Sequence, residues 1–308
     1  MAILVTGASG QFGRAAAERL LAKVPPHELI LTTRTPEKLV DLASRGAQVR
    51  RADFDDAASL PAAFEGADRM LLISTARVGT RVSQHRNAIE AAKRVGVRHI
   101  VYTSVLGAAA PDNPAIVKLD HRATEEILEA SGVAWTFLRD SQYSEAVAMA
   151  MAPVDIMTGR HISNTGEGRV AFVSRDDCVD CAVAILTTPG HENRAYDLTG
   201  PELFTYRQVA ELISELAQVP VEYVPVDDEG MFAHFDSLGV PRHASDDPAQ
   251  GPIPWCSTDM VSFARAIREG FFDVKTDHVE RITGHPPRTL REVLLAYRPT
   301  WPRPPARG

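Results

Sequence analysis

A glycine-rich segment near the start of the chain has the residue types that hold a dinucleotide. It covers residues 6–13, follows a short apolar run and precedes a helical pattern. Glycines in such a turn let backbone N–H groups approach a pyrophosphate at the positive end of the helix, and the last one lets helix and strand pack closely. The predicted pyrophosphate site consists of Gly7, Ala8, Ser9, Gly10, Gln11, Phe12 and Gly13.

The residues after the second predicted strand indicate which dinucleotide binds. A site for NAD(H) usually has a carboxylate there, about 20 residues after the glycines, which binds the ribose hydroxyls. This chain has Arg34 instead, and Lys38 follows one helical turn later. Because a guanidinium pairs with a phosphate, these residues favour NADP(H) over NAD(H). The alternative is that both are solvated surface charges.

Two further pairs of residues follow predicted strands. Asp53 and Phe54 come after the third strand, where they would flank an adenine, and Ser74 and Thr75 come after the fourth. Ligands of open α/β sheets bind outside the carboxyl ends of the strands. We therefore expect Ser74 and Thr75 to face the ribose and the phosphates.

Two of the three cysteines have the C-x-x-C spacing that is also found in redox and metal sites. No second pair accompanies Cys178 and Cys181, and both share a helical face with Ile185. This pattern is typical of small buried hydrophobic side chains. The sequence therefore predicts no metal site.

The composition is that of a soluble globular protein. The chain has 308 residues, of which 44% are hydrophobic and 24% charged. Its formal net charge of −7 argues against a nucleic-acid partner. No run approaches the ~20 apolar residues that would span a membrane. With three cysteines and no basic leader, we expect a cytoplasmic protein.

Strand-like and helix-like segments alternate through the first two thirds of the chain. Predicted strands cover residues 2–6, 28–33, 48–52, 69–74, 99–104, 134–138 and 195–199. Predicted helices cover residues 13–23, 35–44, 60–64, 82–95, 120–130 and 176–186. This βα rhythm predicts the α/β class, a doubly wound parallel sheet of the Rossmann type.

The rhythm weakens after residue 200. We expect a helix over 205–217 with Thr205 as its N-cap, a strand over 219–226, helices over 228–238 and 259–269, and a loop over 241–254. The tail after Tyr297 is expected to be extended or disordered. The predicted domains are an NADP(H)-binding domain, 1–200, and a smaller α+β substrate-covering domain, 201–308, to which residues 141–169 contribute.

Taken together, the motifs resemble the NmrA-like group of atypical short-chain dehydrogenases/reductases, in particular its quinone-reductase and triphenylmethane-reductase branch. The resemblance covers nearly the whole chain and weakens after residue 228. It rests on residues 7–13, 34, 72–74, 84–87, 102–104, 121–125, 138–145, 174–177 and 283–287. One departure is Ala146, where the group usually has Asn.

The resemblance places an ordinary short-chain dehydrogenase's Tyr-x-x-x-Lys pair at Val117 and His121, so the usual proton donor is missing. Hydride transfer to a conjugated acceptor, which spreads the incoming charge, still works without a strong acid. The candidates for a supporting catalytic role are His121, Ser104 and Tyr143. Their alternatives are local packing for His121, ribose binding for Ser104 and a pocket wall for Tyr143.

By the same resemblance, further residues would contact the nicotinamide half of the cofactor. These are Thr103, Arg139, Ser141 and Arg175. A surface salt bridge or a loop-capping role is the alternative for the residues of 139–144 and for Arg175. Apolar residues of the last third would supply walls for a flat acceptor, unless they are ordinary core: Met231, Phe232, Phe235, Trp255, Phe263, Phe271 and Phe272.

The leading hypothesis is a flavin-free, NADPH-dependent reductase that acts on a quinone-like, imine-like or otherwise conjugated small molecule. The alternative of a different class is a non-catalytic NADP(H) sensor that acts through a protein partner, since a retired enzyme would also lack the Tyr-Lys pair. An epimerase or lyase that uses the cofactor transiently is a third reading. A homodimer is a state that the sequence allows.

Overall fold

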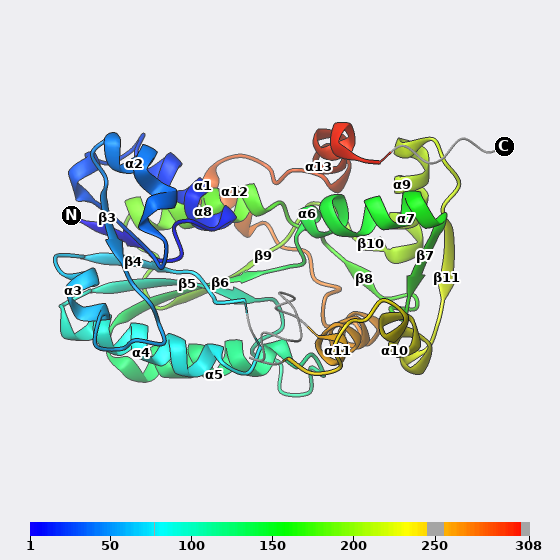
Figure 1. Cartoon of the computed structure of the whole chain (residues 1–308), viewed down its shortest axis with the longest axis horizontal. Helices are drawn as coiled ribbons and strands as arrows, with labels where there is room; N and C mark the ends of the chain where they lie inside the picture. The colour runs from blue at the N-terminus through cyan, green and yellow to red at the C-terminus, as the bar shows by residue number, and fades with distance from the viewer. Residues whose placement is uncertain (77, 245–255, 303–308) are drawn as a thin grey trace. The chain divides into compact units, whose positions relative to one another are not determined.

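The computed structural model describes residues 1–76, 78–244 and 256–302. The chain forms two compact units, which interleave along the sequence (Figure 1). The sheet unit comprises Met1–Val105, Asp120–Arg139 and Cys178–Asp197. The second unit comprises Leu106–Leu119, Asp140–Asp177 and Leu198–Gly308. Residues 141–169 thus belong to the second unit, whereas the domain boundary at residue 200 stays a prediction.

A seven-stranded sheet forms the centre of the sheet unit, as predicted. Its order is β3-β2-β1-β4-β5-β6-β9. The strands are β1 (Ile3–Val5), β2 (Leu29–Thr33), β3 (Gln48–Arg51), β4 (Arg69–Leu72), β5 (His99–Val105), β6 (Ala134–Asp140) and β9 (Arg194–Leu198). β1 pairs in parallel with both β2 and β4. Every residue of β1 and β2 is buried, because helices cover both faces of the sheet.

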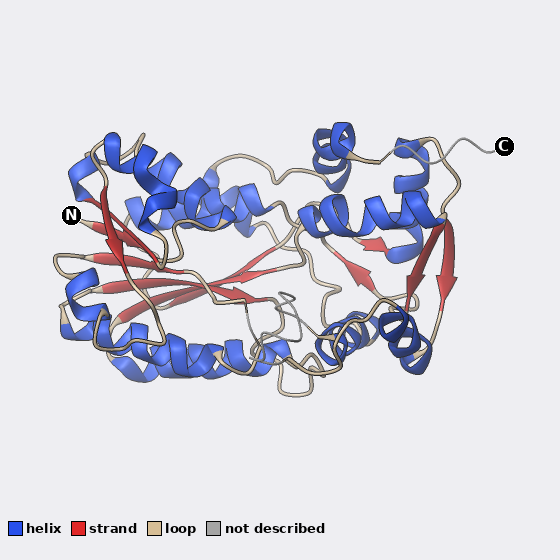
Figure 2. Cartoon of the chain, in the orientation of Figure 1, coloured by secondary structure: helices blue, strands red, loops and turns tan. Residues whose placement is uncertain are grey.

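The helices lie on two sides of this sheet (Figure 2). The helices of this part of the chain are α1 (Gln11–Leu20), α2 (Val40–Ser44), α3 (Leu60–Phe64), α4 (Arg81–Arg94), α5 (Val117–Ser131) and α8 (Arg175–Thr187). α3, α4 and α5 lie on one face, where Phe64, Ile89 and Leu128 pack into one apolar cluster with Leu4 and Ile100 of the sheet. α1 and α8 lie on the other face. This is the doubly wound α/β fold.

The chain changes direction across the sheet at β1. β2 lies on one side of β1 and β4 on the other, and both are parallel to it. Ligands of such sheets bind outside the carboxyl ends of the strands at this switch point. The glycine-rich turn follows β1, and residues 73–76 follow β4, so both segments lie at the switch point.

The second unit is built from short elements. Its first segments are α6 (Ser144–Ala146), a π-helical turn (Val147–Met151) and α7 (Ala152–Thr158). Two small sheets follow: β7 (Arg160–Ser163) pairs with β11 (Glu222–Pro225), and β8 (Arg169–Val170) pairs with β10 (Phe204–Thr205). The remaining helices are α9 (Tyr206–Ala217), α10 (Asp228–Ser237), α11 (Ser257–Arg268), α12 (His278–Thr283) and α13 (Leu290–Tyr297).

Several local predictions are confirmed in detail. Thr205 caps α9 through a capping box, in which its hydroxyl and the Gln208 side chain each bond the other residue's backbone N–H. Cys178 and Cys181 are fully buried on α8. The sequence patterns missed the short elements β7, β8, β10, α6, α7, α12 and α13, because strands of two to four residues and helices of three to eight residues show too little periodicity.

The tail differs from the expected loose segment up to the last residue described. Arg298–Thr300 form a 3₁₀ turn, and the indole N–H of Trp301 donates to the carbonyl of Ala148 at 2.9 Å. Residues 303–308, most of the predicted 241–254 loop and Trp255 lie outside the described residues. Among the helices that the structure describes, none is long and apolar enough to cross a membrane.

Candidate functional site

The glycine-rich turn leaves no room for side chains at its closing position. A Cβ atom on Gly13 would lie 2.5 Å from the carbonyl oxygen of Gly7 and 2.8 Å from Cα of Ala8. Gly7 itself adopts a φ of +58°, which glycine reaches at little cost. The N-cap of α1 is Gly10, and no side chain caps this helix end. The first N–H groups of α1 are therefore open to an anion, which fits a bound pyrophosphate.

The end of β2 is fastened to this turn. The N–H of Ala8 donates to the carbonyl of Thr32 at 3.0 Å, and the hydroxyls of Ser9 and Thr33 lie 2.8 Å apart. Thr35 donates its N–H to the Thr33 hydroxyl at 3.1 Å. This bonding holds the backbone on both sides of residue 34 beside the predicted pyrophosphate site.

Arg34 and Lys38 are both exposed. Within the described part of the chain, the Arg34 guanidinium has no hydrogen bond and no ion pair. Arg14 of α1, by contrast, pairs with Asp41 at 2.7 Å. A guanidinium without a partner in its own chain is the charge that a 2′-phosphate needs.

The ends of β1, β4 and β5 are joined through threonine hydroxyls. Thr6 donates its hydroxyl to the Leu71 carbonyl at 3.0 Å and accepts from the N–H of Ile73 at 3.0 Å. Thr103 accepts from the N–H of Ser74 at 2.8 Å. This bonding places predicted cofactor residues of β5 and of the segment after β4 next to each other at the switch point.

Thr75, Asp53 and Phe54 also lie in bonded segments. The hydroxyl oxygen of Thr75 is buried and has no hydrogen-bond partner among the described residues. Asp53 accepts from the N–H of Asp55 at 3.1 Å, and the carbonyl of Phe54 accepts from the side-chain amide of Asn87 at 2.9 Å. The turn after β3 is thereby fixed to α4.

A buried carboxylate, missed in the sequence, orients Ser104. The Ser104 hydroxyl donates to Oε1 of Glu125 at 2.8 Å, and the Glu125 side chain is fully buried. Arg139 binds both oxygens of the same carboxylate, at 2.9 and 2.8 Å. The Ser104 hydroxyl thus donates its hydrogen bond to Glu125 within the sheet unit, so toward a ligand it can act only as a hydrogen-bond acceptor. Arg139 forms the ion pair that the sequence left open as its alternative role.

His121 is buried on α5 and neutral. Its Nδ1 lies 2.9 Å from the hydroxyl of Tyr102, and the residue is 6% exposed. Burial, with a smaller contribution from the charge of Arg81, holds the pKa of His121 well below its usual range. Burial also raises the pKa of Tyr102. These contacts favour the packing role for His121 over a role as an acid.

The second unit holds the other predicted residues. The Tyr143 hydroxyl donates to Oδ2 of Asp140 at 2.5 Å, and the Arg175 guanidinium lies 5.5 Å from the centre of the Tyr143 ring. Ser141 is buried, and its hydroxyl has no partner among the residues described. Glu145 accepts from the N–H of Arg175 at 2.9 Å. Arg175 and Tyr143 are therefore held close together.

Two of the apolar residues expected to form walls are buried in the second unit, and the others that the structure describes are partly exposed. Phe272 is fully buried and packs against Phe263 with ring centres 4.6 Å apart and the rings tilted by 52°. Met231 and Phe232 pack against Phe235. The core role thus applies to Phe235 and Phe272, and the wall role of the others stays a prediction.

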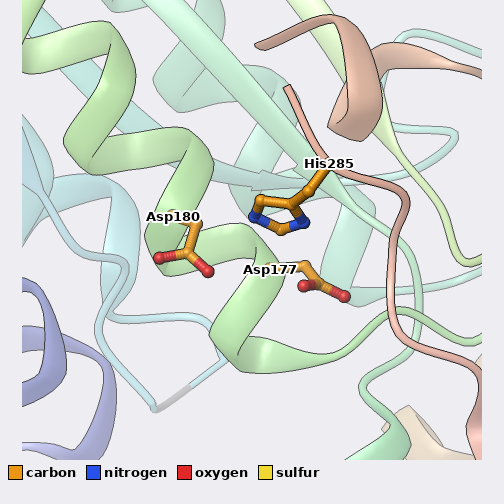
Figure 3. Close-up of side chains that lie close together, drawn as sticks. All are labelled: Asp177, Asp180 and His285. Carbon is orange, nitrogen blue, oxygen red and sulfur yellow. The ribbon is translucent and has the colours of Figure 1, made fainter. Parts of the chain in front are cut away.

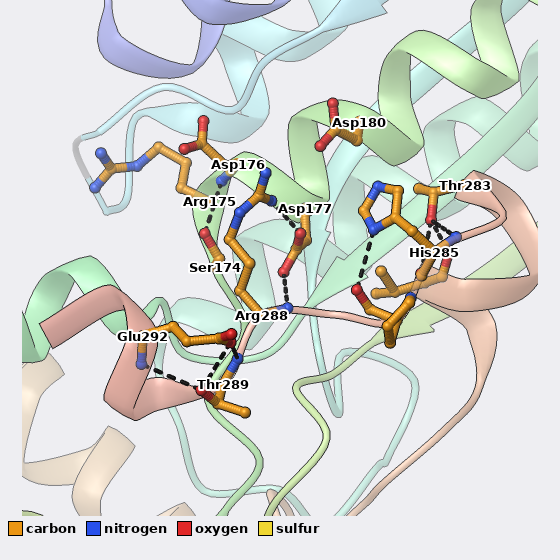
Figure 4. Close-up of polar contacts among 12 residues, drawn as sticks. Ser174, Arg175, Asp176, Asp177, Asp180, Thr283, His285, Arg288, Thr289 and Glu292 are labelled. Atoms are coloured by element: carbon orange, nitrogen blue, oxygen red, sulfur yellow. Dashed lines mark hydrogen bonds and ion pairs between the residues drawn. The ribbon is translucent and has the colours of Figure 1, made fainter. Parts of the chain in front are cut away.

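Two carboxylates at the start of α8, Asp177 and Asp180, already form ion pairs with arginines of the same chain. Asp177 is fully buried and accepts from the N–H of Arg288 at 2.8 Å and from its guanidinium (Figure 4). His285 lies close to Asp177 (Figure 3), and its Nδ1 bonds the Pro286 carbonyl at 3.0 Å. Asp180, one turn along α8, pairs with Arg19 at 3.2 Å. The bonds between Arg288 and Asp177 hold the segment before α13 to the start of α8.

Comparison with known proteins decides the family. A family model described as NAD(P)H-binding matches residues 7–189. The chain belongs to this NAD(P)H-binding family. It is 34% identical to quinone oxidoreductase 2 of Escherichia coli K12 over 290 residues, which are 94% of this chain and 96% of that protein. It is an NmrA-like atypical short-chain reductase, an oxidoreductase that uses NAD(P)H.

Solved structures of similar reductases agree with this family assignment. An E. coli NADPH-dependent quinone oxidoreductase, QOR2, in complex with NADPH has a TM-score of 0.86 at 33% identity, and the match covers 95% of this chain and 98% of that one. The triphenylmethane reductase of Citrobacter sp. in complex with NADP(H) has a TM-score of 0.83 at 29% identity, covering 96% and 100% of the two chains.

Proposed function

We propose that this reductase transfers hydride from NADPH, without a flavin, to a small conjugated acceptor such as a quinone, an imine or a cationic dye. The observation that carries the proposal is on α5. By the family resemblance, Val117 and the buried, neutral His121 stand where an ordinary short-chain dehydrogenase has its tyrosine and lysine. On that placement, α5 does not supply the tyrosine acid that a simple ketone requires.

The preference for NADPH rests on Arg34. Hydrogen bonds of Thr33 and Thr35 hold the backbone around it, and the guanidinium is exposed with no partner among the described residues. A charge-assisted hydrogen bond to a phosphate contributes about 1.5–3 kcal/mol. NADH has no phosphate at this position, so it gains nothing from Arg34.

The acceptor class follows from the missing acid. When bound, NADPH supplies a hydride from C4 of its nicotinamide ring. A quinone spreads the incoming negative charge over its ring system, and a cationic dye has a positive charge to neutralise. Water can protonate such a product afterwards, so the protein needs only to position the two reactants. The similarity to a quinone oxidoreductase and to a triphenylmethane reductase supports this class.

The test is the rate of NADPH oxidation against a panel of acceptors: benzoquinone, a naphthoquinone, a cationic triphenylmethane dye, a cyclic imine and a simple ketone. No flavin is added, and the absorption spectrum of the purified protein reports any bound flavin. We expect turnover of conjugated acceptors and none of the ketone. Arg34→Ala should raise the KM for NADPH at least about tenfold and leave the KM for NADH unchanged.

The sensor hypothesis makes the opposite prediction for the same panel. The absence of the Tyr-x-x-x-Lys pair at positions 117 and 121 also suits a protein that only binds NADP(H). Tight NADPH binding with no acceptor turned over would support the sensor and contradict the reductase proposal. A flavin that co-purifies in stoichiometric amounts would contradict the flavin-free part.

A further inference from the structure

Three consecutive backbone N–H groups after β4 each donate to a side chain from a different element. Those of Ile73 and Ser74 donate to the threonine hydroxyls at the ends of β1 and β5, described above. That of Thr75 donates to Nε2 of His85 on α4 at 3.1 Å. Side chains rather than another strand thus fix the backbone of this segment.

The other ring nitrogen of His85 shows which tautomer accepts this bond. Nδ1 of His85 lies 2.9 Å from the hydroxyl of Thr124 on α5. That hydroxyl donates its own proton to the carbonyl of Asp120 at 2.8 Å, so it accepts from Nδ1–H. Nε2 therefore carries the lone pair that the Thr75 N–H requires.

The surroundings of His85 keep the ring neutral. The residue is fully buried, and its ring meets that of Tyr102 edge to face at 5.4 Å. Burial, and to a lesser extent the charge of Arg81, lower the pKa of His85 to about 3. Arg81 in turn donates to the carbonyls of Thr75 and Ala76, at 2.5 and 2.8 Å. A second proton at Nε2 would face the Thr75 N–H and break the bond.

We propose that His85 is a positioning residue for the dinucleotide: by accepting from the Thr75 N–H, it fixes residues 73–76 at the switch point of the sheet. The inference rests on the proposed function, which places the cofactor there. The Thr75 hydroxyl oxygen is itself buried, so the group that this bond would position beside the ligand is the backbone of residues 73–76. His85 itself is buried and does not touch the cofactor.

Two substitutions separate the two bonds of His85. His85→Gln keeps an acceptor near the position of Nε2, and His85→Asn keeps only a polar group near the position of Nδ1. Both variants remain polar at a buried site, so a purely structural role predicts similar losses of stability. The positioning role predicts that NADPH binding weakens in His85→Asn and is largely rescued in His85→Gln.

The measurement is the Kd of NADPH from the change in nucleotide fluorescence, with the KM for NADPH and the kcat under saturating acceptor. For His85→Asn we expect a Kd and KM about three- to tenfold higher, the effect of one lost hydrogen bond, with kcat changed less. An NADPH Kd equal to wild type in a folded His85→Asn overturns the proposal. Equal weakening in both variants also overturns it.

The matched control is His99→Asn. His99 is likewise a buried neutral histidine bonded to a threonine, Thr136, at 2.8 Å, but it begins β5 at the end of the strand away from the switch point. We expect it to lower stability and to leave NADPH affinity unchanged. If His85→Asn does not fold, Thr124→Val is the alternative variant. It removes the hydroxyl that fixes the His85 tautomer, and it should also weaken the binding of NADPH.

Binding by the wild type separates the two proposals. If the wild-type protein does not bind NADPH, the proposed function fails. If it binds NADPH and Thr124→Val and His85→Asn bind equally well, only the inference about His85 fails. Hydrogen exchange of the Thr75 amide gives an independent readout, and it should be faster in His85→Asn than in His85→Gln.

Discussion

The hydroxyl of Ser104 donates its proton to a carboxylate that is itself buried and paired. Glu125 also accepts from the Arg139 guanidinium through both oxygens, so both carboxylate oxygens act as acceptors here. Toward a ligand, the Ser104 hydroxyl oxygen can therefore act as a hydrogen-bond acceptor through its lone pairs. A ribose hydroxyl is a suitable donor to it. Ser104 cannot donate a proton to a substrate while its bond to Glu125 persists.

We therefore expect Ser104→Ala to weaken NADPH binding about three- to tenfold, the effect of losing one hydrogen bond to the ligand. The pH profile of kcat should keep its shape, because no titrating acid is removed. The measurement is kcat and the KM for NADPH across pH with a naphthoquinone as acceptor. Loss of an ionisation from the kcat profile in Ser104→Ala would instead make Ser104 part of the proton path.

At the scale of elements, the turn between β1 and α1 depends on the absence of one side chain. The space for a Cβ atom at residue 13 is taken by backbone atoms of Gly7 and Ala8, at 2.5 and 2.8 Å. Backbone cannot swing aside as a flexible side chain can. The start of α1 would have to move away from the strand, and with it the N–H groups expected to bind the pyrophosphate.

Gly13→Ala should accordingly lower the free energy of unfolding by about 1–3 kcal/mol and weaken NADPH binding more than tenfold. Thermal unfolding and a fluorescence titration with NADPH measure the two effects. Gly132→Ala is the control: Gly132 has a positive φ but open space around its Cβ direction, so only stability should fall. Unchanged NADPH affinity in a folded Gly13→Ala would refute a cofactor role for this turn.

The elements of the sheet unit were predictable because their signals are local. β1 and β2, for example, are short apolar runs buried throughout, and α3 was predicted with the bounds that it has. The elements of the second unit were less predictable from the sequence. β8 and β10 have two residues each, and the π turn at 147–151 interrupts the helical period between α6 and α7.

The contacts of the site were predictable only in part. The glycine turn and Arg34 stand at fixed distances from a strand, and the sequence shows both. Glu125 meets Ser104 from 21 residues away, and Thr124 meets His85 from 39 residues away. Such pairs depend on how α5 packs against β5 and against α4. The motif at residues 121–125, one of those on which the family resemblance rests, was the one signal that could have pointed to Glu125.

For the whole molecule, buried histidines make stability depend on pH. Burial, the largest cause in each case, lowers the pKa of His85 to about 3 and that of His99 to about 4, and holds that of His121 well below its usual range. In the unfolded chain each would titrate at about 6.5. Between these values the unfolded state binds more protons, so stability is full above pH ~6.5 and falls as the pH drops toward 4.

Each such histidine contributes a slope of up to about 1.4 kcal/mol per pH unit below its unfolded pKa. Denaturant unfolding between pH 7 and 5 should show this loss, and His99→Gln should reduce it, because glutamine keeps a donor for Thr136 without titrating. A free energy of unfolding that stays level from pH 7 to 5 would contradict the neutral burial of these residues.

The central claim is direct hydride transfer from NADPH to a conjugated acceptor with no flavin between them. NADPH deuterated at C4, tested in both stereochemical forms, and a cationic triphenylmethane dye provide the most direct test. The deuterium would end on carbon, where it does not exchange with water, and mass spectrometry of the reduced dye detects it. We expect one labelled form to give a product with one deuterium. A reduced dye whose new hydrogen comes from the solvent with either form, or no reduced dye at all, would contradict the claim.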